Sequence, residues 1–167
     1  MIIGMSEHAF TVLHTIISLV GIFSGLFVLV AMLGGRTSVQ TSLFLVSTVL
    51  TSVTGFMFPS ANFGPPQIVG VISLVVLAFA IAALYLGHLA GAWRWIYVVT
   101  AVLALYLNVF VGVVQTFQKV PFFHALAPTQ TELPFIVAQG VVLIAFVTLG
   151  IAAARKYHPA AAAPPLA

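Results

Sequence analysis

Among the residues of this sequence, histidine has the most varied chemistry: it can bind a metal or a haem iron and can take up or release a proton near neutral pH. His14 lies about four residues into the first long apolar run, and His124 lies in the longest polar connection. A bis-histidine haem needs two imidazoles at one depth on opposite sides of its iron, and His14 with His124 or His8 remains a possible pair because all three lie on the outer side. His88 lies about 21 residues into the third apolar run, near its opposite end, so it cannot share an iron with His14.

A structural role is the favoured interpretation of His14, as a neutral imidazole hydrogen-bonded to a neighbouring helix near the membrane interface. The leading expectation is therefore that the chain holds no cofactor, with a b-type haem as the alternative. No metal site is expected, because His8, His14 and Glu7 match no standard ligand spacing.

Neutral polar residues form a second pattern, a stripe along one face of the fourth apolar run. Spacings of three and four residues connect Tyr97, Ala101, Ala104, Asn108, Gly112, Gln115 and Lys119. Helix packing is the favoured interpretation of this stripe. The polar side chains nevertheless gather toward one side, under the longest connection. We predict there a small outward-facing pocket whose lining is His14, Asn108, Gln115, His124 and Gln139.

The sequence lacks the residues that several kinds of active site require. The chain has no cysteine and no aspartate, which excludes disulfides, thiolate metal sites and a Ser/His/Asp triad. No apolar run contains an acid, the group on which proton relays and cation-coupled transporters depend. The sequence thus favours a protein that is not an enzyme.

The elements that carry these residues are predicted to be membrane-spanning helices. Hydrophobic residues make up 62% of the chain and charged residues 4%, against about 45–50% and about 25% in soluble domains. Five runs approach the ~20 residues that cross a hydrocarbon core. They cover residues 10–33, 39–58, 67–89, 93–117 and 134–154. The fold class is therefore all-α, a single helical bundle over residues 1–157, followed by a disordered cytoplasmic Ala/Pro tail at 158–167.

The cations predict an orientation. With the N-terminus outside, the inner loops hold Arg36, Arg94, Arg155 and Lys156, and the outer side holds Lys119. This bias is the positive-inside pattern, and it favours N-out and C-in. The cations never cluster beyond a pair, so no nucleic-acid partner is expected.

Contact between helices is predicted from small residues. Gly21 and Gly25 form a GxxxG face that could serve packing within the chain, a homo-oligomer or a membrane-complex partner. The remaining partner is the lipid bilayer itself.

The five short-looped spans resemble small multi-spanning proteins of bacterial inner membranes, which implies a multi-pass location in the cytoplasmic membrane. The leading functional hypothesis is a non-enzymatic accessory or assembly subunit of a membrane complex. One alternative is an electron-transfer protein with a b-type haem or quinone near the outer face. Another is a small transporter or channel for a neutral solute, in which Asn108 and Gln115 provide the hydrogen bonds.

Overall fold

A computed structural model describes residues 1–2, 4–59 and 63–159 of the chain, and it is all-helical, with no strand among these residues. The all-α prediction is confirmed. In chain order the elements are α1 (Glu7–Leu33), α2 (Thr41–Gly55), α3 (Pro65–Ile81), the π-helix η1 (Ala82–Leu86), α4 (Ala92–Lys119), α5 (Pro121–Leu126) and α6 (Leu133–Lys156).

Local sequence determines where these helices begin and end. Ser6 caps α1 by accepting a hydrogen bond from the Ala9 amide at 3.2 Å, as short hydroxyl side chains do at helix starts. The helix ends at Gly34 and Gly35, and Gly35 takes a positive φ of 72° that a side chain would strain. Prolines occupy the first turns of α3, α5 and α6, where the missing amide costs no hydrogen bond.

Four helices are long and apolar enough to cross a membrane, judged by length and composition. They are α1, the continuous segment Pro65–Leu86, α4 and α6. The second apolar run gives a shorter helix than expected. It forms 15 helical residues, Thr41–Gly55, instead of the run 39–58. At 1.5 Å per residue this helix is about 22 Å long, less than the ~30 Å of a hydrocarbon core.

Two local features were not expected. The connection predicted between the last two spans contains the one-and-a-half-turn helix α5. The third run ends in the π-helix η1, followed by His88 and Leu89 with positive φ values of 46° and 58°. Of the predicted tail, His158 and Pro159 continue beyond α6, and residues 160–167 lie outside the described part of the chain.

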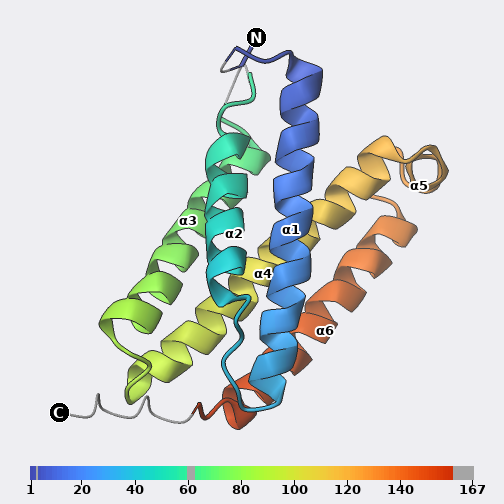
Figure 1. Cartoon of the computed structure of the whole chain (residues 1–167). Coiled ribbons are helices and arrows are strands. Elements are labelled where there is room, and N and C mark those ends of the chain that lie inside the picture. Colours follow the sequence, from blue (N-terminus) through green and yellow to red (C-terminus); the bar gives the residue numbers. More distant parts are fainter. Residues whose placement is uncertain (3, 60–62, 160–167) are drawn as a thin grey trace.

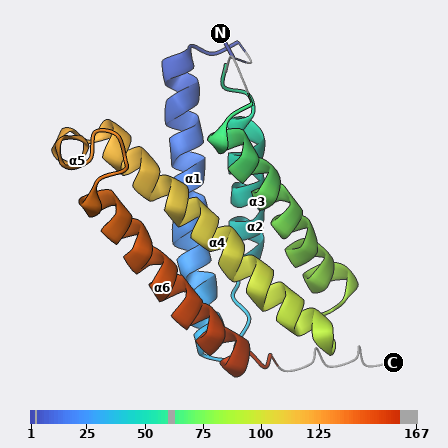
Figure 2. The ribbon, with the colours of Figure 1, turned by 180° about the vertical axis from the view of Figure 1, so that it is seen from behind.

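The helices alternate in direction, so the described ends of the chain lie at opposite ends of the bundle (Figure 1). The end of α2, the start of α3 and the helix α5 lie at the same end as the N-terminus. The connections between α1 and α2 and between α3 and α4 lie at the other end, which we call the C-terminal end. Helix α4 crosses the bundle obliquely, with α6 beside it (Figure 2).

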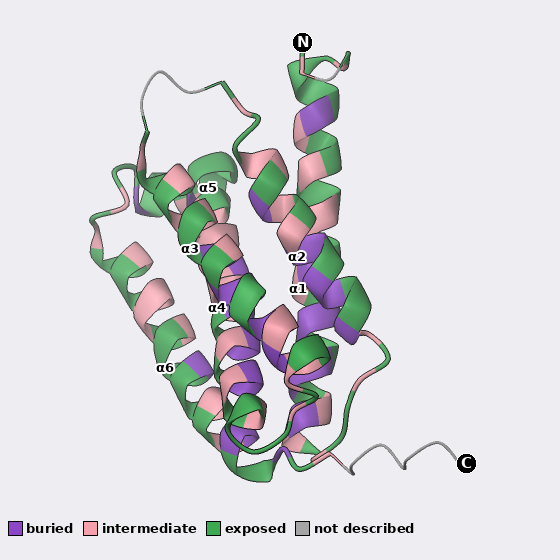
Figure 3. Cartoon of the chain, turned by 90° about the vertical axis from the view of Figure 1, so that its left-hand side faces the viewer, coloured by how far each residue is buried: buried purple, intermediate pink, exposed green. Residues whose placement is uncertain are grey.

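Close packing is concentrated toward the C-terminal end. The buried apolar cluster takes its members from the second halves of α1, α3 and α6 and from the first halves of α2 and α4. Because successive helices run in opposite directions, these halves all lie at one end. Leu77, Ala80 and Ala104 are at most 1% exposed there. Helix α6 is covered least (Figure 3): 6% of its most apolar stretch is buried, against 33% for α1 and α4.

The predicted GxxxG face is used inside the chain. Both glycines are buried. A Cβ on Gly25 would lie 2.6 Å from Leu105 and 2.8 Å from Phe44, and one on Gly21 would lie 3.3 Å from Asn108. Because α2 and α4 take up this face, a homo-oligomer would need another surface, and the partner itself stays a prediction.

Candidate functional site

A cavity of about 700 Å³ lies between α1, α2, α3 and α4, at the N-terminal end of the bundle where the helices diverge. This volume falls within the roughly 300–1,000 Å³ typical of small-molecule sites. The cavity is lined by the first halves of α1 and α3 and the second halves of α2 and α4. The opposite halves of these helices form the packed core. One end of the bundle is therefore filled with side chains, and the other holds space.

Helical periodicity gives each long wall of the cavity. On α1 the lining residues are Thr11, His14, Thr15, Ser18, Leu19 and Ile22, and on α4 they are Leu107, Asn108, Val111, Gly112, Gln115, Thr116 and Lys119. Steps of three and four residues keep each set on one helix face. The C-terminal end of α2 and the start of α3 close the space between these two walls.

His14 is half-buried and is held by a hydrogen bond of 2.7 Å between its Nδ1 and Thr54 Oγ1. The Thr54 hydroxyl donates its proton to the Leu50 carbonyl at 2.6 Å. A hydroxyl has one proton, so the arrangement that satisfies both contacts has Thr54 donating to Leu50 and accepting from His14, with the imidazole hydrogen on Nδ1. In this tautomer the other ring nitrogen, Nε2, is a hydrogen-bond acceptor. The Phe58 ring stands edge-on to the imidazole at 5.2 Å and fixes its plane.

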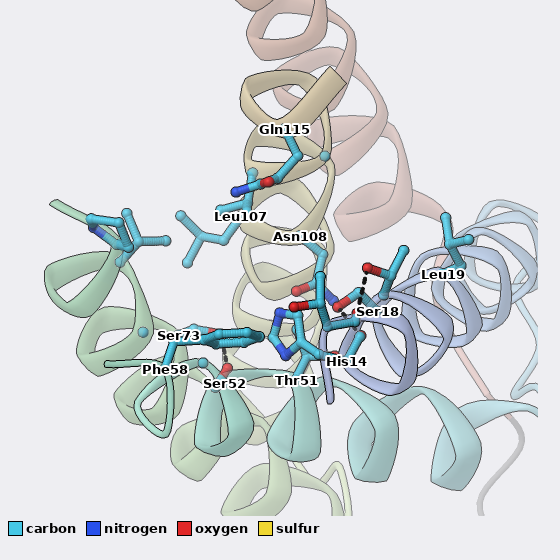
Figure 4. A pocket seen from close by; sticks show the side chains of 18 of the residues that line it. His14, Ser18, Leu19, Thr51, Ser52, Phe58, Ser73, Leu107, Asn108 and Gln115 are labelled. Atoms are coloured by element: carbon cyan, nitrogen blue, oxygen red, sulfur yellow. Dashed lines mark hydrogen bonds between the residues drawn. The ribbon is translucent and has the colours of Figure 1, made fainter. Parts of the chain in front are cut away.

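Asn108 is buried on α4 and donates through Nδ2 to Thr48 Oγ1 at 3.0 Å. Its Oδ1 has no donor within the described part of the chain. Neither Asn108 Oδ1 nor His14 Nε2 is among the side-chain atoms that are both enclosed and unpartnered. Neither acceptor is therefore fully enclosed, and both residues line the cavity. Figure 4 shows His14, Thr51 and Asn108 converging there from three helices.

The hydroxyl groups of the cavity differ in how they are satisfied. Thr15 and Ser18 donate to carbonyl oxygens one turn earlier in their own helix, at 2.8 Å. Ser52 and Ser73 form a bridge of 3.0 Å between α2 and α3. Thr51 is the exception: its Oγ1 is enclosed and has no partner in the described residues. An enclosed hydroxyl without a partner costs about 1–3 kcal/mol.

The charge around the cavity is positive and lies at its rim. Lys119, at the end of α4, is exposed and lines the cavity, and none of the described lining residues is acidic. The deeper polar groups are neutral. Gln115 is exposed at the same end, and its amide makes no hydrogen bond to another described residue.

The structure brings three of the five predicted pocket residues to this cavity, namely His14, Asn108 and Gln115. Gln139 lies on α6 and donates to the Phe110 carbonyl on α4 at 3.2 Å, outside the cavity lining. His124 lies exposed on α5 and does not line the cavity either. The structure thus does not bring His124 to the cavity with His14. Whether any of the five binds a ligand stays a prediction.

Three hydroxyl residues of the cavity lining were not part of the predicted pocket: Thr51, Ser52 and Ser73. A signal existed on α2, because its hydroxyl residues recur at helical spacing, but the same pattern equally indicates packing. Ser73 stands alone in an apolar run, and nothing local shows that it faces Ser52. No cluster of three or more histidine or acidic side chains that could hold a metal occurs within the described ranges.

Comparisons of the chain with protein-family models, with curated proteins and with solved structures found no match.

Proposed function

We propose that this chain is a multi-pass protein of the bacterial inner membrane that lies N-out and C-in and crosses the bilayer five times. Support comes from four helices of membrane length. Helix α2 is the fifth crossing: it follows α1 and returns the chain to the side from which α3 begins. Arg36, Arg94, Arg155 and Lys156 gather at the C-terminal end, and Lys119 alone of the five cations lies at the other. A helix as short as α2 is accommodated by local thinning of the bilayer.

We further propose that the protein binds a small uncharged molecule in the cavity between α1, α2, α3 and α4. The observation that carries this proposal is the pair of unpartnered acceptors, His14 Nε2 and Asn108 Oδ1, in a space of about 700 Å³. Apolar walls with a few convergent polar groups are typical of ligand sites. A charged ligand is disfavoured deep in the cavity, where no opposite charge would offset its desolvation.

The cavity supports the three functional hypotheses to different degrees. The hydrogen-bonding site expected for a neutral-solute transporter corresponds best to the cavity, because Asn108 and Gln115 both line it. An accessory subunit of a larger complex stays a prediction that no contact supports. A bis-histidine haem is the least supported, because His14 is the one histidine that lines the cavity among the described residues.

Native mass spectrometry of the detergent-purified chain tests the binding proposal. The informative variant is Gly112→Leu, because a side chain at Gly112 would project into the cavity, with a Cβ that lies 3.6 Å from Ile22. The matched control is Gly140→Leu on α6, where a Cβ meets nothing within 4 Å.

We expect a small-molecule adduct on the parent chain and on the control, and its loss from Gly112→Leu. An adduct of equal abundance on both variants, or no adduct on the parent chain after extraction in a mild detergent, would contradict the proposal.

A further inference from the structure

We propose that the ligand is a lipid-soluble alcohol or phenol, and that it reaches the cavity sideways from the acyl-chain layer, between α3 and α4. This inference rests on the proposed binding function and adds to it the chemical class of the ligand and its route.

The route follows from how α3 and α4 are placed. Both helices contribute to the buried cluster at the C-terminal end, α3 with Leu77 and Ala80 and α4 with Ala104. Toward the other end they diverge (Figure 2). The cavity lining comes from these diverging halves, residues 66–73 of α3 and 107–119 of α4. In a bilayer this opening lies beside lipid rather than beside water.

The walls of the opening are apolar. Val69 and Gly70 on α3 and Leu107 and Val111 on α4 line the cavity beside the divergence. Figure 4 shows Leu107 extending from α4 on the side of α3, away from His14. An apolar tail would therefore find apolar side chains here, while the polar groups of α1 and α2 stay behind them.

The chemical class of the ligand's polar head group follows from the hydrogen-bond donors and acceptors that the cavity offers. His14 Nε2 and Asn108 Oδ1 both accept, so the ligand must donate. A hydroxyl is the neutral donor that lipid-soluble molecules commonly carry. A carbonyl or an ether offers lone pairs only: it could accept from the exposed Gln115 amide, but it would leave the two acceptors, His14 Nε2 and Asn108 Oδ1, unpartnered. An ammonium group would lack a carboxylate among the described lining residues.

The first experiment tests the route. The native chain has no cysteine, so Val69→Cys and Val111→Cys each carry a single site for a bimane fluorophore. The labelled full chain is placed in liposomes of phosphatidylcholine, with or without bromine on the acyl chains. The control in contact with lipid is Val141→Cys, 61% exposed on α6, and the control in water is Thr37→Cys in the connection after α1.

We expect brominated lipid to quench both cavity positions to at least half of the loss seen at Val141, with little effect of aqueous iodide. Quenching by iodide at the level of Thr37, with no effect of brominated lipid, would overturn the lateral route.

The second experiment tests the head group. The full chain in lipid nanodiscs is photolabelled with a long-chain alkylphenol that carries a diazirine in its tail. Competition is measured with unlabelled 4-nonylphenol, with its methyl ether and with water-soluble 4-methylphenol. One net hydrogen bond corresponds to roughly tenfold in affinity, so the phenol should compete about tenfold better than the ether. In His14→Phe, which removes Nε2 and keeps an aromatic ring, this ratio should fall toward one.

The outcomes separate the two proposals. Equal competition by phenol and ether on the parent chain would overturn the hydroxyl assignment. Competition by 4-methylphenol as strong as that by 4-nonylphenol would indicate a water-borne solute, which overturns the present inference and leaves the binding proposal intact. Labelling that avoids the cavity peptides, with no loss in Gly112→Leu, would overturn both.

Discussion

At the scale of single residues, Gly25 controls how closely α1 approaches its neighbours. A Cβ at this position would lie 2.6 Å from Leu105 and 2.8 Å from the Phe44 ring, both of which are almost fully buried. Overpacking of this kind costs about 1–3 kcal/mol. We expect Gly25→Ala to lower the free energy of unfolding by that amount, measured by thermal unfolding of the purified chain in detergent.

Gly140→Ala is the matched control for this prediction. Gly140 also lies within a helix, but a Cβ there meets no atom within 4 Å. Alanine in a helix interior is favoured over glycine by roughly 0.5–1 kcal/mol. The control should therefore be slightly more stable than the parent chain. If Gly25→Ala is equally stable, the close approach of α1 to α2 and α4 is wrong.

Two threonines one turn apart on α2 are predicted to respond in opposite directions to the same substitution. Thr48 is fully buried and accepts from Asn108, so Thr48→Val leaves the amide without its partner and should cost about 1–3 kcal/mol. Thr51 Oγ1 is enclosed without a partner, so Thr51→Val removes an unsatisfied group and should stabilise the ligand-free chain by about 1 kcal/mol. Thermal unfolding of the two variants measures the difference, and equal shifts would contradict the assignment.

At the scale of elements, Glu132 forms the start of α6. Desolvation acts to raise the pKa of its carboxyl group, but hydrogen bonds from its own amide and from Thr129 and Thr131 together outweigh that effect and lower the pKa below 4.5. The carboxylate accepts from the Thr129 hydroxyl at 2.9 Å and from the Thr131 amide at 3.1 Å.

A lowered pKa fixes the direction of the pH dependence. The carboxylate stabilises the folded loop fully above the unfolded pKa of about 4.5, and this contribution disappears as the pH falls through the lower, folded pKa. We expect amide hydrogen exchange in residues 129–136 to accelerate below pH 4.5 relative to the rest of the chain. Glu132→Gln should remove that pH dependence, and a parent chain without it would refute the role of Glu132.

The positions of the long helices were predictable from sequence because apolar runs and Gly/Pro breaks are local properties. The length of α2 was not, because residues 56–58 continue the apolar run while their backbone leaves the helix. At the site, the sequence could place His14, Asn108 and Gln115 in one group by their depth in the predicted membrane spans. Gln139 has the right depth too, but it points at the Phe110 carbonyl. Depth along a helix is readable from sequence, whereas the neighbour that each face meets depends on tertiary packing.

At the scale of the whole molecule, the proposed orientation predicts which ends are accessible from each side of the membrane. Single cysteines are placed at exposed positions by Ala125→Cys on α5 and Thr37→Cys after α1. A maleimide that cannot cross membranes should label Ala125→Cys in intact cells and Thr37→Cys only after the membrane is opened. The opposite pattern would reverse the proposed orientation, and labelling of both in intact cells would contradict the odd number of spans.

The absence of α6 from the cavity lining has a consequence for biosynthesis. Among the described residues, all those that line the cavity lie between Thr11 and Val120, and α6 contributes none. Ribosomes deliver the chain from its N-terminus, so the described walls of the cavity are made before α6 is translated. A ligand could thus be captured by a nascent chain, and α6 would then be added to an already occupied bundle.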